Sequence, residues 1–219
     1  MRQDFEKYQE GEPRGAADVG PDVIISPDTL RDRRLPPGQT RTRKWPVLHF
    51  GRVPMVGPAD WRLEVAGLVE RPLSLGWEDF QRLPRVKVFA DFHCVTHWSR
   101  LGNVWEGVSV RQLMDLAGAR PEARFVLAMG YDDGWTTNVP LVDLLAPDVL
   151  LADTHDGAPL TADHGGPVRL MVPRLYAWKS AKWLKRLVLA DTDQPGYWEQ
   201  NGYHDYGDPW REQRFSEFG

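Results

Sequence analysis

The sequence predicts an α+β fold that is rich in β-structure, with mixed sheets and short helices between the strands. Short runs of alternating or continuous apolar residues recur along the chain, which is the pattern of strands. The stretches of helical periodicity between these runs are brief and end at proline or glycine. The 18 prolines and 10 tryptophans indicate a loop-rich structure with aromatic-walled pockets.

The order of these patterns predicts one domain preceded by an extended arm. Residues 1–44 are dominated by glycine, proline and charge, and only residues 23–26 resemble a strand. The domain covers residues 45–219. Its first strand is expected over residues 61–66, where apolar and polar residues alternate until Gly67.

Helix and strand then alternate. A helix is expected over residues 75–83, where a proline ends it, and a strand over residues 86–94. Ser109-Val110-Arg111-Gln112 matches a capping box, which opens a helix that continues through residue 116 and ends at Gly118.

The second half of the chain repeats this pattern with shorter elements. Strands are expected over residues 125–129, 135–139, 149–152, 168–172 and 181–190. Residues 142–145 form a helical turn, and Asp156-Gly157 fits a hairpin turn. The aromatic and acidic tail, residues 191–219, is expected to wrap the domain as an ordered segment.

Composition and charge exclude several classes of protein. With 42% hydrophobic and 26% charged residues, the chain has the composition of an ordinary globular protein. A net charge of −4 gives no reason to expect a nucleic-acid partner. No stretch approaches the roughly 20 apolar residues that cross a bilayer, and the N-terminus lacks the apolar core of a secretory signal. No membrane partner is therefore expected, and the expected location is the cytoplasm.

The single cysteine opens the first group of residues that could carry chemistry. Phe92-His93-Cys94-Val95-Thr96-His97-Trp98-Ser99 runs from a strand into a polar, aromatic loop. One cysteine excludes a disulfide framework and any cysteine-cluster zinc or iron–sulfur site. Cys94 could be a small buried hydrophobe, a nucleophile paired with a histidine, or a soft thiolate ligand for a redox metal.

A second group is glycine-rich and basic. His164-Gly165-Gly166-Pro167-Val168-Arg169 is followed by Val172-Pro173 and by Tyr176-Ala177-Trp178-Lys179-Ser180-Ala181-Lys182-Trp183. The glycines let backbone approach a ligand closely, and arginine, lysine and serine side chains bind phosphate. The group could therefore hold a phosphate-bearing organic cofactor without a P-loop. The alternative is a basic strand on the solvated surface.

Together, the strand ending in cysteine and the later pattern His-Gly-x-Pro-x-Arg…Pro…Lys-Ser-x-Lys-Trp-Leu resemble the molybdopterin-binding domain of the sulfite-oxidase family. The resemblance runs from about Trp45 to about Tyr203. It is greatest to the haem-free bacterial members, such as the catalytic subunit of methionine-sulfoxide reductase. It implies a sulfite-oxidase-type molybdopterin-binding fold and a cofactor with one molybdenum and one pterin.

The resemblance also implies roles for individual residues. Cys94 would bind molybdenum beside the two dithiolene sulfurs of the pterin, and Tyr203 would be the active-site tyrosine. His164 and Arg169 would contact the pterin and its phosphate. The other residues that match cofactor-binding positions of the family are Trp45, Leu48, His49, Phe50, Thr137, Ala177, Trp178, Lys179, Ser180 and Lys182.

The remaining aromatic and imidazole groups are interpreted from their positions. His97, Trp98 and Tyr203 are candidates for the substrate pocket, where His97 could supply a proton near neutral pH. His93 lies on the strand face opposite Cys94 and is expected to be structural. His155 and His204 are expected at the surface.

Two departures from the family affect the substrate. Sulfite oxidases carry an arginine five positions after the ligand cysteine, where this chain has Ser99 beside Arg100. A second arginine lies in the segment where this chain has Leu48 and His49. The loss of fixed cations weakens binding of a dianion, so sulfite is a doubtful substrate.

The function expected from the sequence is oxygen-atom transfer on a small substrate, sulfite or sulfoxide-like, by a molybdopterin-dependent oxidoreductase. The sequence has no haem-binding or iron–sulfur segment, so a separate electron-transfer partner is expected. Three alternatives stay open: a molybdopterin-binding module without independent activity, a metal-free enzyme that uses Cys94 and His97, and a structural protein.

Overall fold

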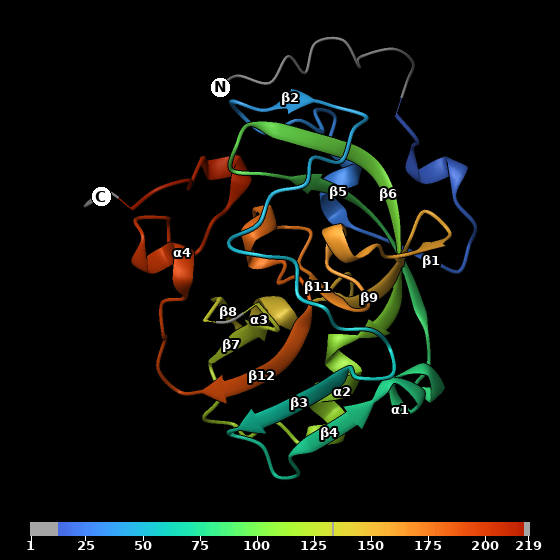
Figure 1. Ribbon diagram of the computed structural model, residues 1–219. Coiled ribbons are helices and arrows are strands. Elements are labelled where there is room, and N and C mark those ends of the chain that lie inside the picture. Colours follow the sequence, from blue (N-terminus) through green and yellow to red (C-terminus); the bar gives the residue numbers. More distant parts are fainter. Residues whose placement is uncertain (1–12, 133, 217–219) are drawn as a thin grey trace.

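The structure is a computed structural model that describes residues 13–132 and 134–216. Two mixed sheets organise it, with short helices at their edges, which confirms the expected fold class. In Figure 1 the larger sheet lies in the upper part and the smaller sheet in the lower part. Among the described residues, no helix has the length and apolar character needed to traverse a bilayer.

The larger sheet has seven strands, and its main path is β1-β5-β6-β9-β10. Its strands are β1 (Val23–Ile25), β2 (Thr40–Arg41), β5 (Val86–His93), β6 (Trp98–Ser109), β9 (Leu150–His155), β10 (Ala158–Pro159) and β11 (Arg169–Met171). From the arm, β1 pairs with β5 and β2 pairs with β6, both in parallel. The described part of the arm therefore belongs to the sheet.

The smaller sheet has the order β4-β3-β12-β7-β8. Its strands are β3 (Arg62–Gly67), β4 (Leu73–Gly76), β7 (Phe125–Gly130), β8 (Thr136–Pro140) and β12 (Leu184–Ala190). Strand β3 shows the expected alternation, because Leu63 and Val65 are buried while Arg62 and Glu64 are exposed.

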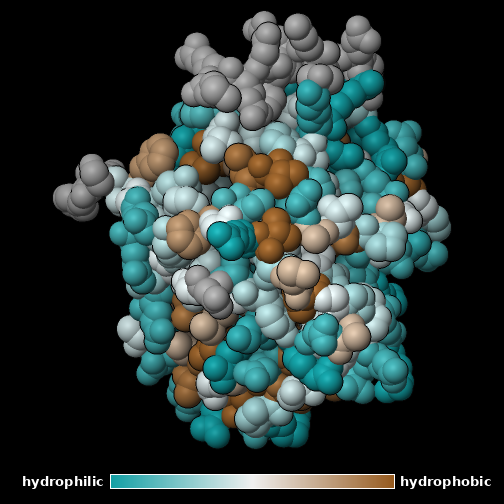
Figure 2. Space-filling model, in the orientation of Figure 1, coloured by the Kyte–Doolittle hydropathy of each residue, from teal (hydrophilic) through white to brown (hydrophobic). Residues whose placement is uncertain are grey.

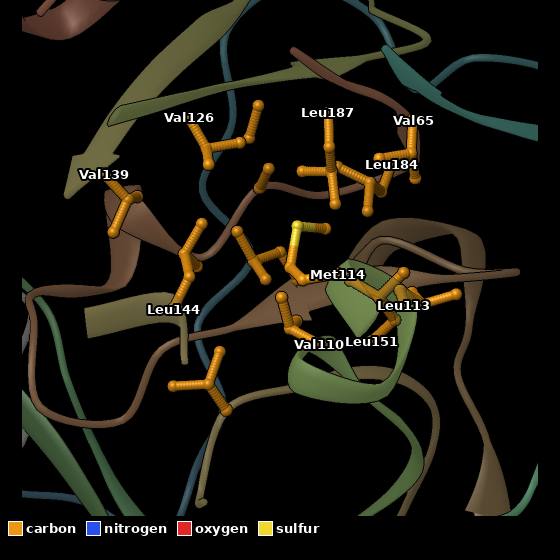
Figure 3. Close-up of a cluster of buried hydrophobic side chains, with 14 of the residues drawn as sticks. Val65, Val110, Leu113, Met114, Val126, Val139, Leu144, Leu151, Leu184 and Leu187 are labelled. Carbon is orange, nitrogen blue, oxygen red and sulfur yellow. The ribbon is translucent and has the colours of Figure 1, made fainter. Parts of the chain in front are cut away.

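The helices are short and join the sheets. The α-helices are α1 (Trp77–Arg82), α2 (Val110–Ala117), α3 (Leu141–Leu144) and α4 (Tyr197–Gln200). Short 3-10 turns are η2 (Ala16–Asp18), η3 (Pro27–Leu30), η4 (Ala162–His164), η5 (Ala177–Lys179) and η6 (Pro209–Arg211). Figure 3 shows Leu113 and Met114 of α2 beneath Leu184 and Leu187 of β12, in the core of the smaller sheet.

A second apolar cluster lies on the larger sheet and includes the site residues. Phe92, Trp105, Leu150 and Met171 form its strand-borne part, and Cys94, Val95, Trp98, Tyr176 and Trp178 extend it beyond the strand ends. The thiol therefore lies where a packed aromatic core passes into loops.

Several expected boundaries were wrong. Leu75 and Gly76 belong to β4, because they pair with β3, and the helix begins only at Trp77. Helix α2 begins after Ser109 as expected, but the Ser109 side chain makes no capping hydrogen bond. Gly118 does end α2, with a left-handed φ of 67°.

One long strand was not predicted from the sequence. The loop expected after Cys94 is a tight turn, and the long strand β6 begins already at Trp98. Gly102 and Gly107 interrupt its alternation of apolar residues. Gly107 is required by packing, because a Cβ there would lie 1.9 Å from the Leu151 carbonyl oxygen.

Candidate active site

A cavity of about 250 Å³ opens where β5 ends, between the arm, η5 and the C-terminal tail. Its walls are mainly apolar and aromatic. The lining residues are Trp45, Pro46, Leu48, His49, Phe50, Phe92, Cys94, Val95, Thr96, Trp98, Asp132, Trp135, Arg169, Ala177, Trp178, Ser180, Lys182, Trp183, Trp198 and Tyr203. A few polar groups in an apolar cleft are typical of a small-molecule site.

Cys94 is held in this cavity by its backbone. Its amide nitrogen donates to the Trp98 carbonyl at 2.9 Å, and the His97 amide donates to the Cys94 carbonyl at 3.1 Å. His97 closes this turn with a φ of 71°. The Thr96 hydroxyl donates to the sulfur at 3.2 Å. The thiol position is therefore set by strand pairing and a tight turn rather than by a flexible loop.

Two distant residues clamp the same turn. The Gln39 side-chain amide donates to the Cys94 carbonyl at 3.0 Å, and the Arg214 guanidinium donates to the Val95 carbonyl at 2.7 Å. One clamp comes from the arm and the other from the C-terminal tail.

The environment of the Cys94 thiol does not favour the thiolate that a nucleophile requires in the metal-free protein. Burial raises the pKa of Cys94, and the hydrogen bonds from Thr96 and the charges of Arg214 and Lys182 oppose this only in part. His97 is exposed, does not line the cavity and has its Nδ1 2.8 Å from the Gly38 carbonyl. The expected place of His97 in the substrate pocket is therefore not found. Within the described residues no hydrogen bond joins the Cys94 thiol to a histidine, so the geometry does not favour the metal-free alternative.

Arg169 lies fully inside the protein beside the cavity. Its two Nη atoms donate to the His164 and Ser180 carbonyls, both at 2.9 Å, and its Nε has no hydrogen-bond partner. Burial lowers the pKa of Arg169 to about 9. Within the residues that the structure describes, no carboxylate pairs with it. A buried cation without a counter-ion is costly, so an anionic ligand would stabilise this site.

Lys182 provides a second cation on the cavity wall. Its Nζ donates to the Asp163 carbonyl at 2.6 Å. Burial, followed by the charge of Arg169, lowers the pKa of Lys182 to about 7. Nearby, the Ser180 hydroxyl accepts the Val172 amide at 3.0 Å and also lines the cavity. The Arg169 guanidinium, the Lys182 amine and the Ser180 hydroxyl thus lie around one part of the cavity. All three can donate hydrogen bonds to a phosphate.

Comparison with known proteins gives the family. Residues 50–198 match the family described as "Oxidoreductase molybdopterin binding domain". The chain belongs to this family. The thiol and the two basic side chains that have no carboxylate partner in the described residues fit its cofactor, because molybdenum takes soft sulfur donors and the pterin carries an anionic phosphate.

The relatives include an oxidoreductase and enzymes of sulfur chemistry. The chain is 49% identical to the uncharacterized oxidoreductase YuiH of Bacillus subtilis, over 84% of this chain and 92% of that protein. It is 32% identical to the putative protein-methionine-sulfoxide reductase subunit YedZ1 of Azospira oryzae, over 76% of this chain and 64% of that protein. The identity to sulfite oxidase of Gallus gallus is also 32%, over 69% of this chain but only 39% of that enzyme.

A solved structure supports the same assignment. The sulfane dehydrogenase SoxCD of Paracoccus pantotrophus superposes with a TM-score of 0.59 and 28% identity, over 64% of this chain and 40% of that chain. The resemblance to sulfite-oxidase-family molybdopterin enzymes, and with it the sulfite-oxidase-type fold, is confirmed.

Most of the residues that the family pattern singles out meet at the cavity. Those that line it are Trp45, Leu48, His49, Phe50, Cys94, Arg169, Ala177, Trp178, Ser180, Lys182 and Tyr203. His164 lies behind Trp45, and the two rings stack with centroids 3.7 Å apart. Tyr203 packs between Trp178 and Trp198, at centroid distances of 5.1 and 5.0 Å.

Lys179 and Thr137 are placed elsewhere, in a buried polar cluster around Glu199. Lys179 Nζ lies 2.6 Å from a Glu199 carboxylate oxygen, which also accepts from the Thr137 hydroxyl and the Trp178 indole at 2.9 and 2.8 Å. Asn138 supplies two more acceptors to Lys179. Burial lowers the pKa of Lys179, and the Glu199 carboxylate opposes this. In this structure the cluster therefore positions Trp178.

The positions of the histidines outside the cavity agree only in part with the sequence-based predictions. The expected surface position of His155 was wrong, because its side chain is only 11% exposed and packs between Trp45 and Trp105. Burial lowers its pKa to about 3. His93, which the sequence predicted to be structural, is buried, and its Nδ1 lies 2.8 Å from the Ser99 hydroxyl. His204 is half-buried and accepts the Tyr206 amide at 2.9 Å.

The departures noted in the sequence have a structural counterpart. Ser99 is buried against His93, and Arg100 donates to Asp156 at 2.9 Å, outside the lining of the cavity. Neither residue therefore offers a cation to a substrate beside Cys94.

Proposed function

We propose that this oxidoreductase transfers an oxygen atom to or from an uncharged organic sulfur compound, at a molybdenum bound by Cys94 and one pterin. A single observation carries the proposal: the only thiol of the chain is buried in an aromatic cavity together with two basic side chains, Arg169 and Lys182, with which no carboxylate of the described residues pairs. When bound, the cofactor supplies the two-electron oxygen-atom transfer itself.

Different residues of the chain would bind the cofactor and the substrate. Arg169, Lys182 and Ser180 would bind the phosphate and tail of the pterin, and Cys94 would bind the metal. Trp198, Tyr203 and Trp135 would form the wall for the substrate and exclude water from it. The Tyr203 hydroxyl could donate a hydrogen bond to a substrate oxygen.

The walls of the cavity favour a sulfoxide and its thioether over sulfite. Sulfite is a dianion and needs guanidinium groups that face it, whereas Arg100 is bonded to Asp156 outside the lining of the cavity and Arg169 is assigned to the phosphate of the pterin. A sulfoxide presents one hydrogen-bond acceptor and two apolar substituents, which match indole and phenol walls. Its reduction consumes two electrons and two protons and yields a thioether and water. The similarity to a putative protein-methionine-sulfoxide reductase subunit supports this substrate class.

The decisive experiment compares wild type with Cys94→Ser, both expressed in a host that makes molybdopterin. Elemental analysis should find one molybdenum per wild-type chain and a loss of at least tenfold in the variant, with unfolding temperatures within a few degrees. Thr96→Val is the matched control, because it removes the hydroxyl beside the sulfur but keeps the thiol, and it should retain metal. Retention of stoichiometric, active metal by Cys94→Ser would refute the ligand assignment.

Activity assays separate the remaining alternatives. With reduced riboflavin as electron donor, loaded wild type should reduce methyl p-tolyl sulfoxide. With ferricyanide as electron acceptor, its catalytic efficiency for sulfite oxidation should be at least tenfold lower. Loaded protein without any turnover would indicate a binding module. Activity in metal-free protein that thiol blockers abolish would indicate a cysteine enzyme. The cytoplasmic location stays a prediction, which cell fractionation tests.

A further inference from the structure

We propose that residues 41–55, here called the basic strap, form the docking surface for an acidic, soluble electron-transfer protein. The inference rests on the proposed function, because oxygen-atom transfer requires that two electrons enter or leave for each substrate molecule. A carrier of one electron must therefore dock twice in each turnover. The chain contains one cysteine, so it cannot hold an iron–sulfur cluster that would relay electrons to a distant surface.

The basic strap borders the opening of the cavity. Leu48 and Phe50 line the cavity and are also 47% and 38% exposed, so they lie where the cavity meets solvent. In Figure 1 this segment crosses the front of the molecule between the two sheets, as the cyan trace between β2 and β3. A partner that approaches Cys94 by the shortest route would contact the strap.

The strap has the composition of an interface. Val47, Leu48, Phe50 and Met55 are all exposed, and Met55 is fully so. Figure 2 shows hydrophobic side chains gathered across the middle of the face over which the strap runs. An apolar centre with charged residues around it is the common arrangement of protein–protein interfaces.

The charge of the strap defines the kind of partner. The strap, residues 41–55, contains four of the 27 lysines and arginines and none of the 31 acidic residues, which leaves 23 basic against 31 acidic residues elsewhere. Arg43, Lys44 and Arg52 of this segment are exposed. An acidic protein would therefore be attracted to this face and repelled by the remainder of the chain, which selects both the partner and its orientation.

The strap can also adapt to a partner. Residues 45–56 form no hydrogen bond with the described parts of the chain, and ring contacts hold the segment instead. Trp45 stacks on His164, and Phe50 packs on Tyr197 at a centroid distance of 4.2 Å. A segment with these contacts can shift by a few ångströms without breaking secondary structure.

The test measures binding and turnover separately. Immobilised, cofactor-loaded full-length protein is exposed to an acidic flavodoxin, an acidic plant-type ferredoxin and a basic cytochrome c, at 20 and 300 mM salt. The test variant is Arg43→Glu/Arg52→Glu. The control is Arg120→Glu, which reverses one charge outside the strap where the test variant reverses two. Arg120 is exposed, and its amide donates to the Leu68 carbonyl just after β3.

We expect at least one acidic carrier to bind wild type at 20 mM salt. Its affinity should be at least tenfold lower for the test variant at 20 mM salt, and at least tenfold lower for wild type at 300 mM salt. The control should bind the carrier as tightly as wild type does. Turnover with reduced riboflavin, a small donor that needs no protein docking surface, should be the same in all three proteins. Preferential binding of cytochrome c, equal weakening by Arg120→Glu, or no binding of either acidic carrier would overturn the docking surface. Binding of short duplex DNA as tight as that of the carriers would also overturn it. Absence of riboflavin-driven turnover in wild type would instead refute the proposed function.

Discussion

Replacement of Lys179 by methionine tests whether the cluster around Glu199 is a structural unit. The variant removes the ammonium group that faces Glu199 at 2.6 Å, while both side chains are 0% exposed. Removal of one partner from a buried ion pair typically destabilises a protein by about 3–5 kcal/mol, since the other charge stays buried and unpaired. Methionine has a similar length, so little of this cost comes from lost packing.

The expected result can be read from denaturation of metal-free protein. For a chain of this size, each kcal/mol corresponds to about 2–4 °C in Tm, so Lys179→Met should lower Tm by roughly 6–20 °C. The same substitution at Lys185, which is exposed on β12, is the control and should change stability by less than about 0.5 kcal/mol.

A double-mutant cycle then isolates the pair. Glu199→Gln alone leaves Lys179 with the two oxygens of Asn138 and the Asp205 carbonyl. The double variant Lys179→Met/Glu199→Gln should be more stable than the sum of the single effects predicts, by about 0.5–3 kcal/mol. An effect below 1 kcal/mol for Lys179→Met would refute this reasoning. Loss of pterin without loss of stability would restore Lys179 as a direct cofactor contact.

Two further predictions concern the cofactor and pH. Arg169→Ala should lower pterin fluorescence at least tenfold while the protein still folds, and full occupancy would argue against a phosphate anchor. Burial lowers the pKa of His93 to about 4 and of His155 to about 3, below the value of about 6.5 in the unfolded chain. Their contribution to stability is therefore complete above pH 6.5 and decreases as pH falls towards 4, by about 1.4 kcal/mol per pH unit for each histidine. Urea unfolding at pH 7 and 5 measures this, and His93→Asn should reduce the slope.

The sequence predicted those features of the site and of the fold that depend on residues close together in the chain. Cys94 at a strand end and the pattern from His164 to Trp183 lie in continuous segments. Their residue types allowed a metal thiolate and an anion site, and the resemblance to a known family selected these interpretations. Four strands of the smaller sheet, β3, β7, β8 and β12, were found for the same reason, because alternation and glycine boundaries are properties of short windows.

Long-range contacts decided what the sequence could not show. The Glu199 carboxylate orients both Lys179 and Thr137. Glu199 lies 62 residues after Thr137 in the chain, so no short window of the sequence contains this contact. His155 looked like a surface residue because nothing nearby in sequence predicts that Trp45 packs on it. Strand β6 was concealed by Gly102 and Gly107, whose roles depend on neighbouring strands.

The clamps on the Cys94 turn have a consequence for biosynthesis. Gln39 and Arg214 hold adjacent carbonyls, although 175 residues separate them in sequence. During translation the strand that bears the thiol emerges long before Arg214 is made, so the turn is then held from one side only. Insertion of the prosthetic group into a finished pocket must therefore follow release of residue 214 from the ribosome. A cell that loads this protein would need to deliver the pterin to a completed chain rather than to a nascent one.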